Sequence, residues 1–385
     1  MNQPVLLHIV ERLETLLGKL PVAIQKPILN ELTPLKELFL EQRAPRFVFV
    51  GSLKKTTSEL INILFELSES DASTSVFRWQ EVNVGGRGTI SVLDARGAGH
   101  SAAEQVQAEL KRQPADLIFF FDEGQNAGRA RSTEIENLIA CLDWSDATKA
   151  KVVGIAFSPA KRKSSRGRQP EAANQQLPSR LGEALRHEDQ LLAVIPFGPA
   201  ENFAVQAQQL MSILARELPN EARIEMIRIS RDREAQKEVA QILVKSTAAI
   251  CTAIGAQPIP LADLPILTTL QLVMVSGIMY LSGRERSLRA ATEFVAAIGA
   301  NVGAGMLFRE ATRAILKFFP GWGNLVCGMV AGAGTYAIGR AATVFFLEGV
   351  SIKEARRIYL AARKKRAGAV LTLPERTKAR RSRKK

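Results

Sequence analysis

Cysteine and histidine are scarce in this sequence, which has only three of each among its 385 residues. The cysteines, Cys141, Cys251 and Cys327, lie far apart, and neither a C-x-x-C pair nor a histidine spacing typical of a metal site is present. This scarcity gives no support to a disulfide framework or to a bound metal ion. It favours a reducing, cytoplasmic setting.

Most of the chain also lacks a large net charge. The sequence has 52 basic and 38 acidic residues, a net charge of +14. Lys353 to Lys385 contains 14 basic and 2 acidic residues, so this segment alone contributes +12. The net charge therefore belongs to a basic C-terminal tail, over residues 353–385, and not to the whole protein surface.

The N-terminus lacks the charged start and the uninterrupted apolar core of a secretory signal. Instead, apolar residues recur at intervals of three and four from Leu6 to Phe39, with a break at Pro21. This spacing predicts two amphipathic helices, which form an N-terminal arm over residues 1–44. We expect the arm to pack against the following domain; a dimeric coiled coil is the alternative.

Residues 45–219 alternate between short apolar runs and helical segments. Most of the runs are continuously apolar, as in a parallel sheet that is covered by helices on both faces, so the pattern predicts a doubly wound α/β domain. Strands are expected at Phe47–Val50, Val76–Val82, Thr89–Asp94, Asp116–Phe121, Val152–Phe157 and Leu191–Phe197. Helices are expected at Ser58–Leu67, Ala102–Arg112, Thr133–Leu142, Ser179–Arg186 and Asn202–Leu218.

Strand signals are absent after residue 219, so we expect a second, all-helical and apolar domain over residues 220–352. Its first segment, Glu221–Ala256, predicts one long helix that is stopped by the prolines after it. Further along, the spacing Gly328-x-x-x-Gly332 permits close contact between two helices.

A phosphate-binding loop is present in outline but lacks its working residues. In FVFVGSLKKTTSEL an apolar strand leads to Gly51, and Ser58 opens an apolar helix, which is the frame of G-x-x-x-x-G-K-[ST]. Thr56 and Thr57 stand where the motif has its second Gly and its Lys. That Gly lets the backbone curl around the phosphates, and that Lys neutralises their charge.

The order of the elements, with two strands between the first and second helices and then alternation, resembles the Era-like branch of the translation-factor GTPases. The stretch LDARG matches the family motif D-x-x-G at Asp94 and Gly97. The resemblance implies that this Asp contacts the Mg²⁺ shell and that this Gly senses the γ-phosphate. The guanine-reading motif N-K-x-D is absent, because AFSPAK stands in its place, and FGPAEN replaces the Ser-Ala-Lys turn.

These departures predict a degenerate P-loop GTPase-like domain that folds without nucleotide. We expect no catalytic residue, and we favour neither GTP nor Mg²⁺ as a cofactor. The alternative is a slow or atypical NTPase that uses Asp94 and Ser58 around Mg²⁺. The vestigial nucleotide-binding candidates are Gly51, Lys54, Lys55, Thr56, Thr57, Ser58, Asp94 and Gly97.

Two windows, Leu264–Gly283 and Phe318–Gly339, reach the length of a transmembrane helix without a charge. If both crossed a bilayer, the basic segment Arg284–Lys317 would be translocated, which the positive-inside rule disfavours. We therefore expect re-entrant or surface-lying hairpins, with a switching bundle or an ordinary buried core as alternatives. The membrane-contact candidates are Leu272, Val275, Met279, Phe318, Phe319 and Trp322.

The run from Ala248 to Gly283 resembles the opening of the bacterial domain of unknown function 697. The resemblance covers roughly Glu221 to Ser351, and it implies membrane association downstream of an Era-like GTPase module. The matching positions are Pro258, Pro260, Asp263 and Gln271.

The basic tail, which ends in ERTKARRSRKK, is poor in aromatic residues, so a nucleic-acid partner that stacks its bases is not expected. Anionic lipid headgroups suit its charges better, at about 1 kcal/mol per charge near the membrane surface. The candidate lipid contacts are Lys364, Lys365, Arg366, Arg380 and Arg381. A disordered solubilising tail and a nucleic-acid-binding arm are the alternatives.

Together these features predict a cytoplasmic protein that is peripheral to, or partly inserted in, the inner face of a membrane. We expect it to act as a non-hydrolysing, GTPase-like scaffold or regulator. Such a role requires a protein partner or self-association.

Overall fold

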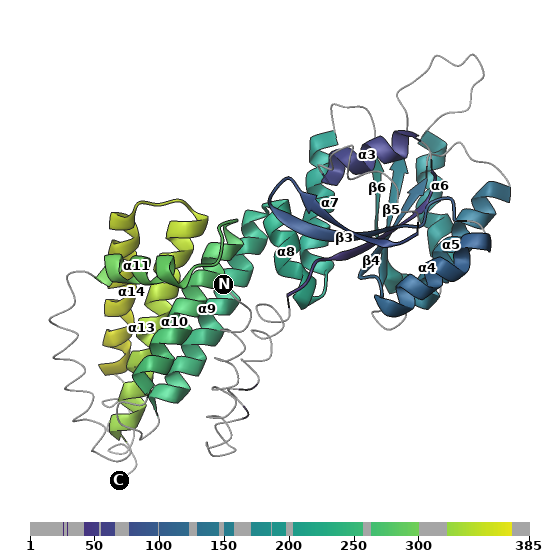
Figure 1. Cartoon of the computed structure of the whole chain (residues 1–385). Helices are drawn as coiled ribbons and strands as arrows, with labels where there is room; N and C mark the ends of the chain where they lie inside the picture. Colours follow the sequence, from purple (N-terminus) through teal and green to yellow (C-terminus); the bar gives the residue numbers. More distant parts are fainter. Residues whose placement is uncertain are drawn as a thin grey trace, which may run out of the picture. The chain divides into compact units, whose positions relative to one another are not determined.

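The computed structural model describes residues 26, 29, 42–53, 55–65, 77–98, 100–122, 129–145, 150–157, 171–185, 187–197, 203–256, 263–299 and 322–371. The chain divides into two compact units between Asp232 and Arg233 (Figure 1). The N-terminal arm predicted over residues 1–44 lies almost wholly outside the described residues.

A six-stranded sheet forms the centre of the first unit, in the order β2-β3-β1-β4-β5-β6 (Figure 1). Neighbouring strands are parallel, except that the edge strand β2 is antiparallel to β3. The strands are β1 (Arg46–Gly51), β2 (Trp79–Val84), β3 (Gly88–Asp94), β4 (Leu117–Asp122), β5 (Lys151–Phe157) and β6 (Leu191–Phe197). All six predicted strands are confirmed, with small shifts at their ends.

Helices cover both faces of this sheet. Alternate side chains of β1 point to opposite faces, so Phe47 and Phe49 join one buried cluster while Val48 and Val50 join the other. The first face carries α3 (Lys55–Phe65), α7 (Phe203–Glu217) and α8 (Asn220–Ser230), and the second carries α4 (His100–Arg112), α5 (Arg129–Trp144) and α6 (Glu171–Ala184). Burial on both sides explains why the strands are apolar throughout, and the α/β class is confirmed.

The prediction of a single helix over Glu221–Ala256 is wrong. The structure contains two helices there, α8 and α9 (Arg233–Gly255). They are separated at Arg231, whose φ of 53° is left-handed and ends α8. The hydroxyl of Ser230 supports the break, because it accepts the Asp232 N–H at 3.3 Å and donates to the Ile227 carbonyl at 3.2 Å.

Helix α8 belongs to the α/β unit, so this unit extends to Asp232 and not only to the predicted boundary at residue 219. Met226 and Ile229 of α8 are part of the core cluster on the first face of the sheet. The carboxylate of Glu225 accepts the backbone N–H of Thr89, in β3, at 3.0 Å. Hydrogen bonding and core burial both bind α8 to the sheet.

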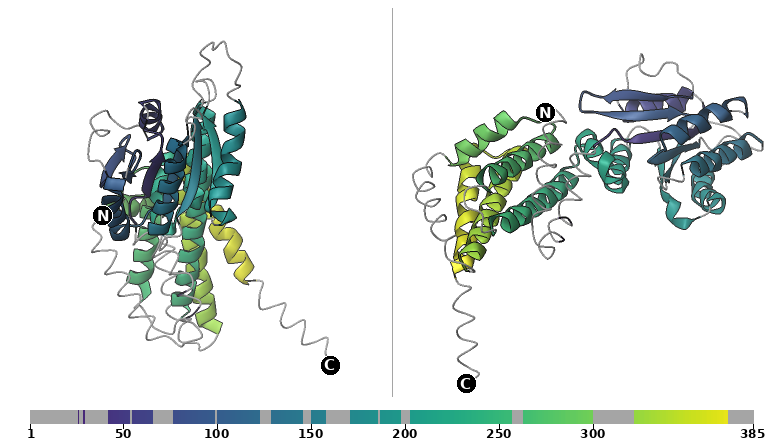
Figure 2. Two further views of the ribbon diagram at one scale, coloured as in Figure 1. Left: turned by 90° about the vertical axis from the view of Figure 1, so that its right-hand side faces the viewer. Right: turned by 60° about the horizontal axis from the view of Figure 1, so that its bottom comes forward.

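The second unit is a bundle of helices (Figure 2). Helices α9, α10 and α13 contact one another in pairs, and α14 packs against α13. The described helices of this unit, besides α9, are α10 (Asp263–Leu281), α11 (Leu288–Gly299), α13 (Trp322–Leu347) and α14 (Ile352–Leu371). The prediction of a helical region after the α/β domain is confirmed.

Glycine allows α9 and α13 to pack closely. A Cβ atom at Gly332 would overlap the hydroxyl of Thr252, and a Cβ at Gly328 would lie 2.5 Å from the Thr252 carbonyl oxygen. From the other helix, a Cβ at Gly255 would lie 2.8 Å from the Cβ of Ala331. The small residues therefore bring the two backbones together, as the spacing of Gly328 and Gly332 predicts.

The first part of the predicted basic tail is helical, because α14 covers residues 352–371. Gly349, with φ of 75°, follows the end of α13. The hydroxyl of Ser351 then accepts the N–H of Glu354 at 3.3 Å, a capping pattern that starts α14. Arg380 and Arg381 lie outside the described residues.

Candidate functional site

The candidate site lies at the carboxyl ends of β1 and β3, near the middle of the sheet. Strand β1 lies between β3 and β4, and the helices that follow β1 and β3 cover opposite faces. In open α/β sheets this reversal is where ligands bind. Gly51, Asp94 and Asp122 are the last residues of β1, β3 and β4.

Gly51 is required by the packing of the sheet itself. Its φ is 106°, and a Cβ atom there would overlap the carbonyl oxygen of Phe121 in β4. The next residue, Ser52, donates its backbone N–H to the same carbonyl at 3.0 Å. The first glycine of the loop motif therefore has a structural reason that involves no ligand.

Only part of the segment predicted to be a vestigial phosphate-binding loop is described. Helix α3 begins at Lys55, and Ser58 in its first turn is half-buried. Lys54 and the side chains of Lys55, Thr56 and Thr57 lie outside the described part. The role of these four residues as vestigial nucleotide-binding candidates therefore stays a prediction.

Arg96 brings two of the predicted site residues together. Its Nε and Nη2 donate to the two carboxylate oxygens of Asp94, at 2.8 Å and 2.6 Å. Its Nη1 donates to the hydroxyl of Ser58 at 3.3 Å. The Arg96 side chain is only 6% exposed, whereas that of Asp94 is 40% exposed. One buried guanidinium thus occupies the oxygen atoms of both residues.

The segment after β3 is held by further contacts within the chain. Ala95 donates its N–H to the Phe49 carbonyl at 2.9 Å, and the Arg96 N–H donates to Asp94 Oδ1 at 3.1 Å. Gly97 has a φ of 70°, and a Cβ there would lie 2.8 Å from a methyl carbon of Leu53. The two loops at the carboxyl ends of β1 and β3 therefore lie in contact.

Sequence reasoning named Asp94, Gly97 and Ser58 but missed Arg96. The only local signal is that an arginine stands inside the D-x-x-G motif, two residues after its Asp. The contact with Ser58 joins residues that are 38 positions apart, and it depends on the parallel pairing of β1 with β3.

A second arginine and carboxylate meet beside this site. Asp122, at the end of β4, has a side chain that is 3% exposed, and Arg180 of α6 approaches it at 3.4 Å. The last acidic residues of β3 and β4 are thus each paired with an arginine of the chain itself.

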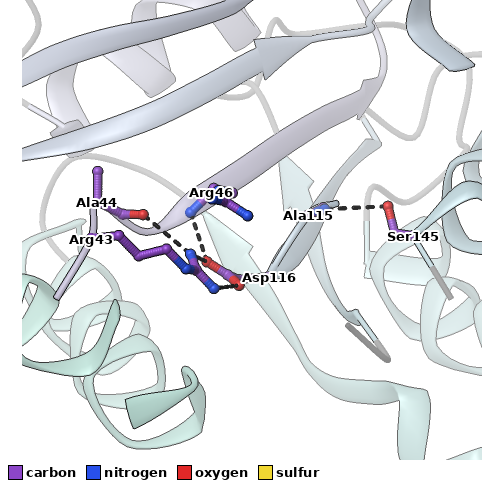
Figure 3. A network of polar contacts seen from close by, with 6 residues as sticks. All are labelled: Arg43, Ala44, Arg46, Ala115, Asp116 and Ser145. Carbon is purple, nitrogen blue, oxygen red and sulfur yellow. Dashed lines mark hydrogen bonds and ion pairs between the residues drawn. The ribbon is translucent and has the colours of Figure 1, made fainter. Parts of the chain in front are cut away.

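The start of β4 carries a different polar network, which is structural (Figure 3). Arg43 donates to both carboxylate oxygens of the buried Asp116 at 2.6 Å, and the backbone N–H of Arg46 donates to the same group at 2.9 Å. Burial by itself lowers the pKa of Arg43. The hydrogen bonds with Asp116 and the negative charges of Asp116 and Glu221 outweigh this effect and raise that pKa. The network ties the segment before β1 to β4, away from the candidate site.

The membrane-contact candidates of α10 lie mostly inside the bundle. Val275 and Met279 are buried, and Leu272 is half-buried, so the first two offer no surface to a bilayer in this conformation. Trp322 is the first residue of α13, but its side chain is outside the described part, as are Phe318 and Phe319.

Among the described residues, one helix, α9, is long and apolar enough to cross a membrane, and 56% of its apolar window is buried. The apolar helical stretch Ile266–Leu281 is shorter. A core helix of a soluble bundle has the same length and composition, so this test alone gives weak support to a membrane span.

The basic residues of α14 include several exposed side chains. Lys353, Arg357 and Lys364 are exposed, although Arg357 forms an ion pair with Glu354 at 2.6 Å. Lys365 and Arg366 continue the helix, but their side chains are not described. Of the five lipid-contact candidates, the structure therefore places the side chain of Lys364 at the surface.

The described residues contain no group of three or more His, Cys, Asp or Glu that could hold a metal ion. None of the three cysteines forms a disulfide, and all three are buried. Burial raises the pKa of the Cys141 thiol to about 12, and it raises that of Cys251 to about 12 despite a hydrogen bond with Thr335. Thiols with such values are protonated and unreactive at neutral pH.

No protein-family model matches the sequence, and no curated protein matches it. The resemblances to the Era-like GTPases and to domain 697 thus rest on the order of the elements and on short motifs of the sequence.

Proposed function

We propose that this protein is a GTPase-like scaffold or regulator that binds a partner without hydrolysing nucleotide, at the cytoplasmic face of a membrane. The observation that carries the proposal is the buried contact of Arg96 with both Asp94 and Ser58. In an active site of this class, the corresponding hydroxyl and carboxylate serve Mg²⁺.

The residues of the loop and the guanidinium of Arg96 both disfavour nucleotide binding. The loop has threonines in place of the glycine and lysine that would surround and neutralise phosphates. A metal–nucleotide complex would also have to displace Arg96 from its bidentate ion pair with Asp94. This displacement is unfavourable, because the ion pair compensates the buried guanidinium for its lost hydration. A nucleotide would thus lack the attractive contacts of the loop, and its metal ion would compete with Arg96 for Asp94.

Membrane association is the second part of the proposal. It is supported by the apolar, glycine-rich helices and by the exposed basic residues Lys353, Arg357 and Lys364 of α14. Basic side chains near a bilayer are attracted to anionic headgroups. Buried cysteines that form no disulfide are consistent with a reducing compartment.

The test is calorimetric titration of the full chain with GTP and with GDP in the presence of Mg²⁺. We expect no binding heat from the natural chain, because both the lysine and the free cation position are missing. A dissociation constant tighter than about 10 μM, equivalent to about −7 kcal/mol, would contradict the scaffold proposal and favour an atypical nucleotide switch.

A repaired variant serves as the comparison. In Thr56→Gly with Thr57→Lys the loop regains the residues of the motif. If this variant binds nucleotide and the natural chain does not, the loop substitutions account for the loss. If the natural chain binds as tightly as the repaired one, the threonines are not the cause and the proposal fails.

A further inference from the structure

We propose that Arg96 is a resident cation, which takes the place of a divalent metal ion between Ser58 and Asp94. The proposal deepens the one above, since it explains how the domain remains folded without metal and nucleotide. In this view the ends of β1 and β3 form a latent metal site that an arginine of the chain keeps filled.

The geometry of the guanidinium supports this role. Three of its nitrogen atoms face oxygen atoms of two residues, with Nε and Nη2 on the carboxylate of Asp94 and Nη1 on the hydroxyl of Ser58. The longest of these contacts is 3.3 Å and the shortest 2.6 Å. A side chain that is 6% exposed and charged needs such partners to compensate for its lost hydration.

The ligands are those that a hard divalent cation prefers. Mg²⁺ and Mn²⁺ bind carboxylate and hydroxyl oxygens together with water molecules. With Arg96 in place, the residues do not fit a metal ion, because both Asp94 oxygens are engaged and a second cation would be repelled. Without the guanidinium, one hydroxyl, one carboxylate and water could complete a metal site.

The resident cation also has a conformational consequence. Three contacts hold the segment from Asp94 to Gly97. They are the ion pair of Arg96 with Asp94, the backbone hydrogen bond from Ala95 to Phe49 and the packing of Gly97 on Leu53. A ligand shifts a conformational equilibrium only through different affinities for the two states. Since the cation is covalently part of the chain, this segment keeps one conformation whether nucleotide is present or not.

The experiment is titration of the full chain with Mn²⁺, without nucleotide, followed by water proton relaxation. For the natural chain we expect no Mn²⁺ site that depends on Asp94. The variant Arg96→Met removes the charge and keeps much of the side-chain volume. We expect it to gain one Mn²⁺ site that is at least tenfold tighter than any Mn²⁺ binding by the natural chain. The added substitution Asp94→Asn should abolish this site.

Arg112→Met is the matched control, because Arg112 also pairs with a carboxylate, that of Glu109, but is 69% exposed. This variant should gain no Mn²⁺ site. A folded Arg96→Met chain without any gain in Mn²⁺ binding would overturn the proposal. An equal gain in Arg112→Met would do the same.

Thermal unfolding keeps the proposal testable if Arg96→Met folds poorly. Loss of the arginine leaves the Asp94 charge uncompensated, so we expect the midpoint to fall by roughly 5 °C. Removing that charge as well, in Asp94→Asn with Arg96→Met, should recover part of the loss. A double variant no more stable than Arg96→Met would show that charge compensation is not the role of Arg96.

The two proposals fail in different ways. Tight GTP binding by the natural chain, with no binding of Mn²⁺ alone, would contradict the scaffold function but support the resident cation. An Asp94-dependent Mn²⁺ site in the natural chain, with no heat from GTP, would contradict the resident cation and leave the scaffold function standing.

Discussion

Gly51 of β1 is paired with Phe121 of β4, and two independent requirements restrict this position. Its φ of 106° is unfavourable for any residue with a side chain, and the space beside its Cα is filled by the backbone of Phe121. A backbone neighbour cannot change rotamer to make room. The glycine is therefore fixed by the sheet, independently of its place in a phosphate-binding motif.

We predict that Gly51→Ala lowers the free energy of unfolding by about 3 kcal/mol, because backbone strain and steric overlap add together. Gly86→Ala is the matched control, since Gly86 also has a positive φ, of 67°, but a Cβ there would meet nothing within 4 Å. It should cost only about 1 kcal/mol. Urea unfolding followed by circular dichroism measures both, and equal losses would refute the steric argument.

Residue patterns named residues at the ends of β1 and β3, but not the contacts that these residues make. Gly51, Ser58, Asp94 and Gly97 could be named from their spacing, because strand ends and helix starts are local features. The role of Arg96 could not, since arginine at a strand end is usually a solvated side chain. Its burial follows from the approach of α3 and β3 in the folded unit.

At the level of elements, α9 and α13 depend on each other. Gly328 and Gly332 of α13 face α9, and Gly339 also lies where a Cβ would be 2.5 Å from a methyl carbon of Val244. Thr335 of α13 accepts a hydrogen bond from the Gln271 amide of α10 at 2.9 Å. The close contact of α9 with α13 and the hydrogen bond between Gln271 and Thr335 thus fix the arrangement of the three helices.

We predict that Gly332→Ala destabilises the helical unit by about 2 kcal/mol, because the added methyl group forces α9 and α13 apart. Gly334→Ala in the same helix meets nothing within 4 Å, so it should stabilise the protein by up to about 1 kcal/mol through helix propensity. Opposite signs in thermal unfolding are the expected result. Stabilisation by both would show that the helices do not pack at Gly332.

The break between α8 and α9 shows a limit of periodicity. Apolar residues continue through the segment at helical intervals, so the sequence predicts a single helix. The left-handed Arg231 interrupts it, and α8 instead buries Ala222, Met226 and Ile229 against the sheet. Packing of α8 on the sheet outweighs the small local cost of one left-handed residue.

For the whole molecule, we predict flotation with liposomes that contain anionic lipid, driven in part by the basic residues of α14. Replacing Lys353, Arg357 and Lys364 with glutamine should reduce the bound fraction at least tenfold, at about 1 kcal/mol per charge. The control replaces Arg78, Lys111 and Arg112, which are exposed basic residues of the α/β unit. Its binding should change little.

Two results would contradict this prediction. Equal loss of liposome binding in the control would mean that charge acts without regard to position. Salt-sensitive binding to nucleic acid that disappears with the α14 substitutions, together with no flotation, would favour the nucleic-acid alternative.

The sequence by itself determined the α/β class, the six strands and the helical second region, because each depends on patterns within a few residues. Tertiary structure decided that α8 packs on the sheet and that Val275 and Met279 are buried. It also decided that Arg96 contacts Ser58 and Asp94. These outcomes depend on contacts between distant segments. Local propensity does not encode such contacts, since they form only when strands pair and helices pack.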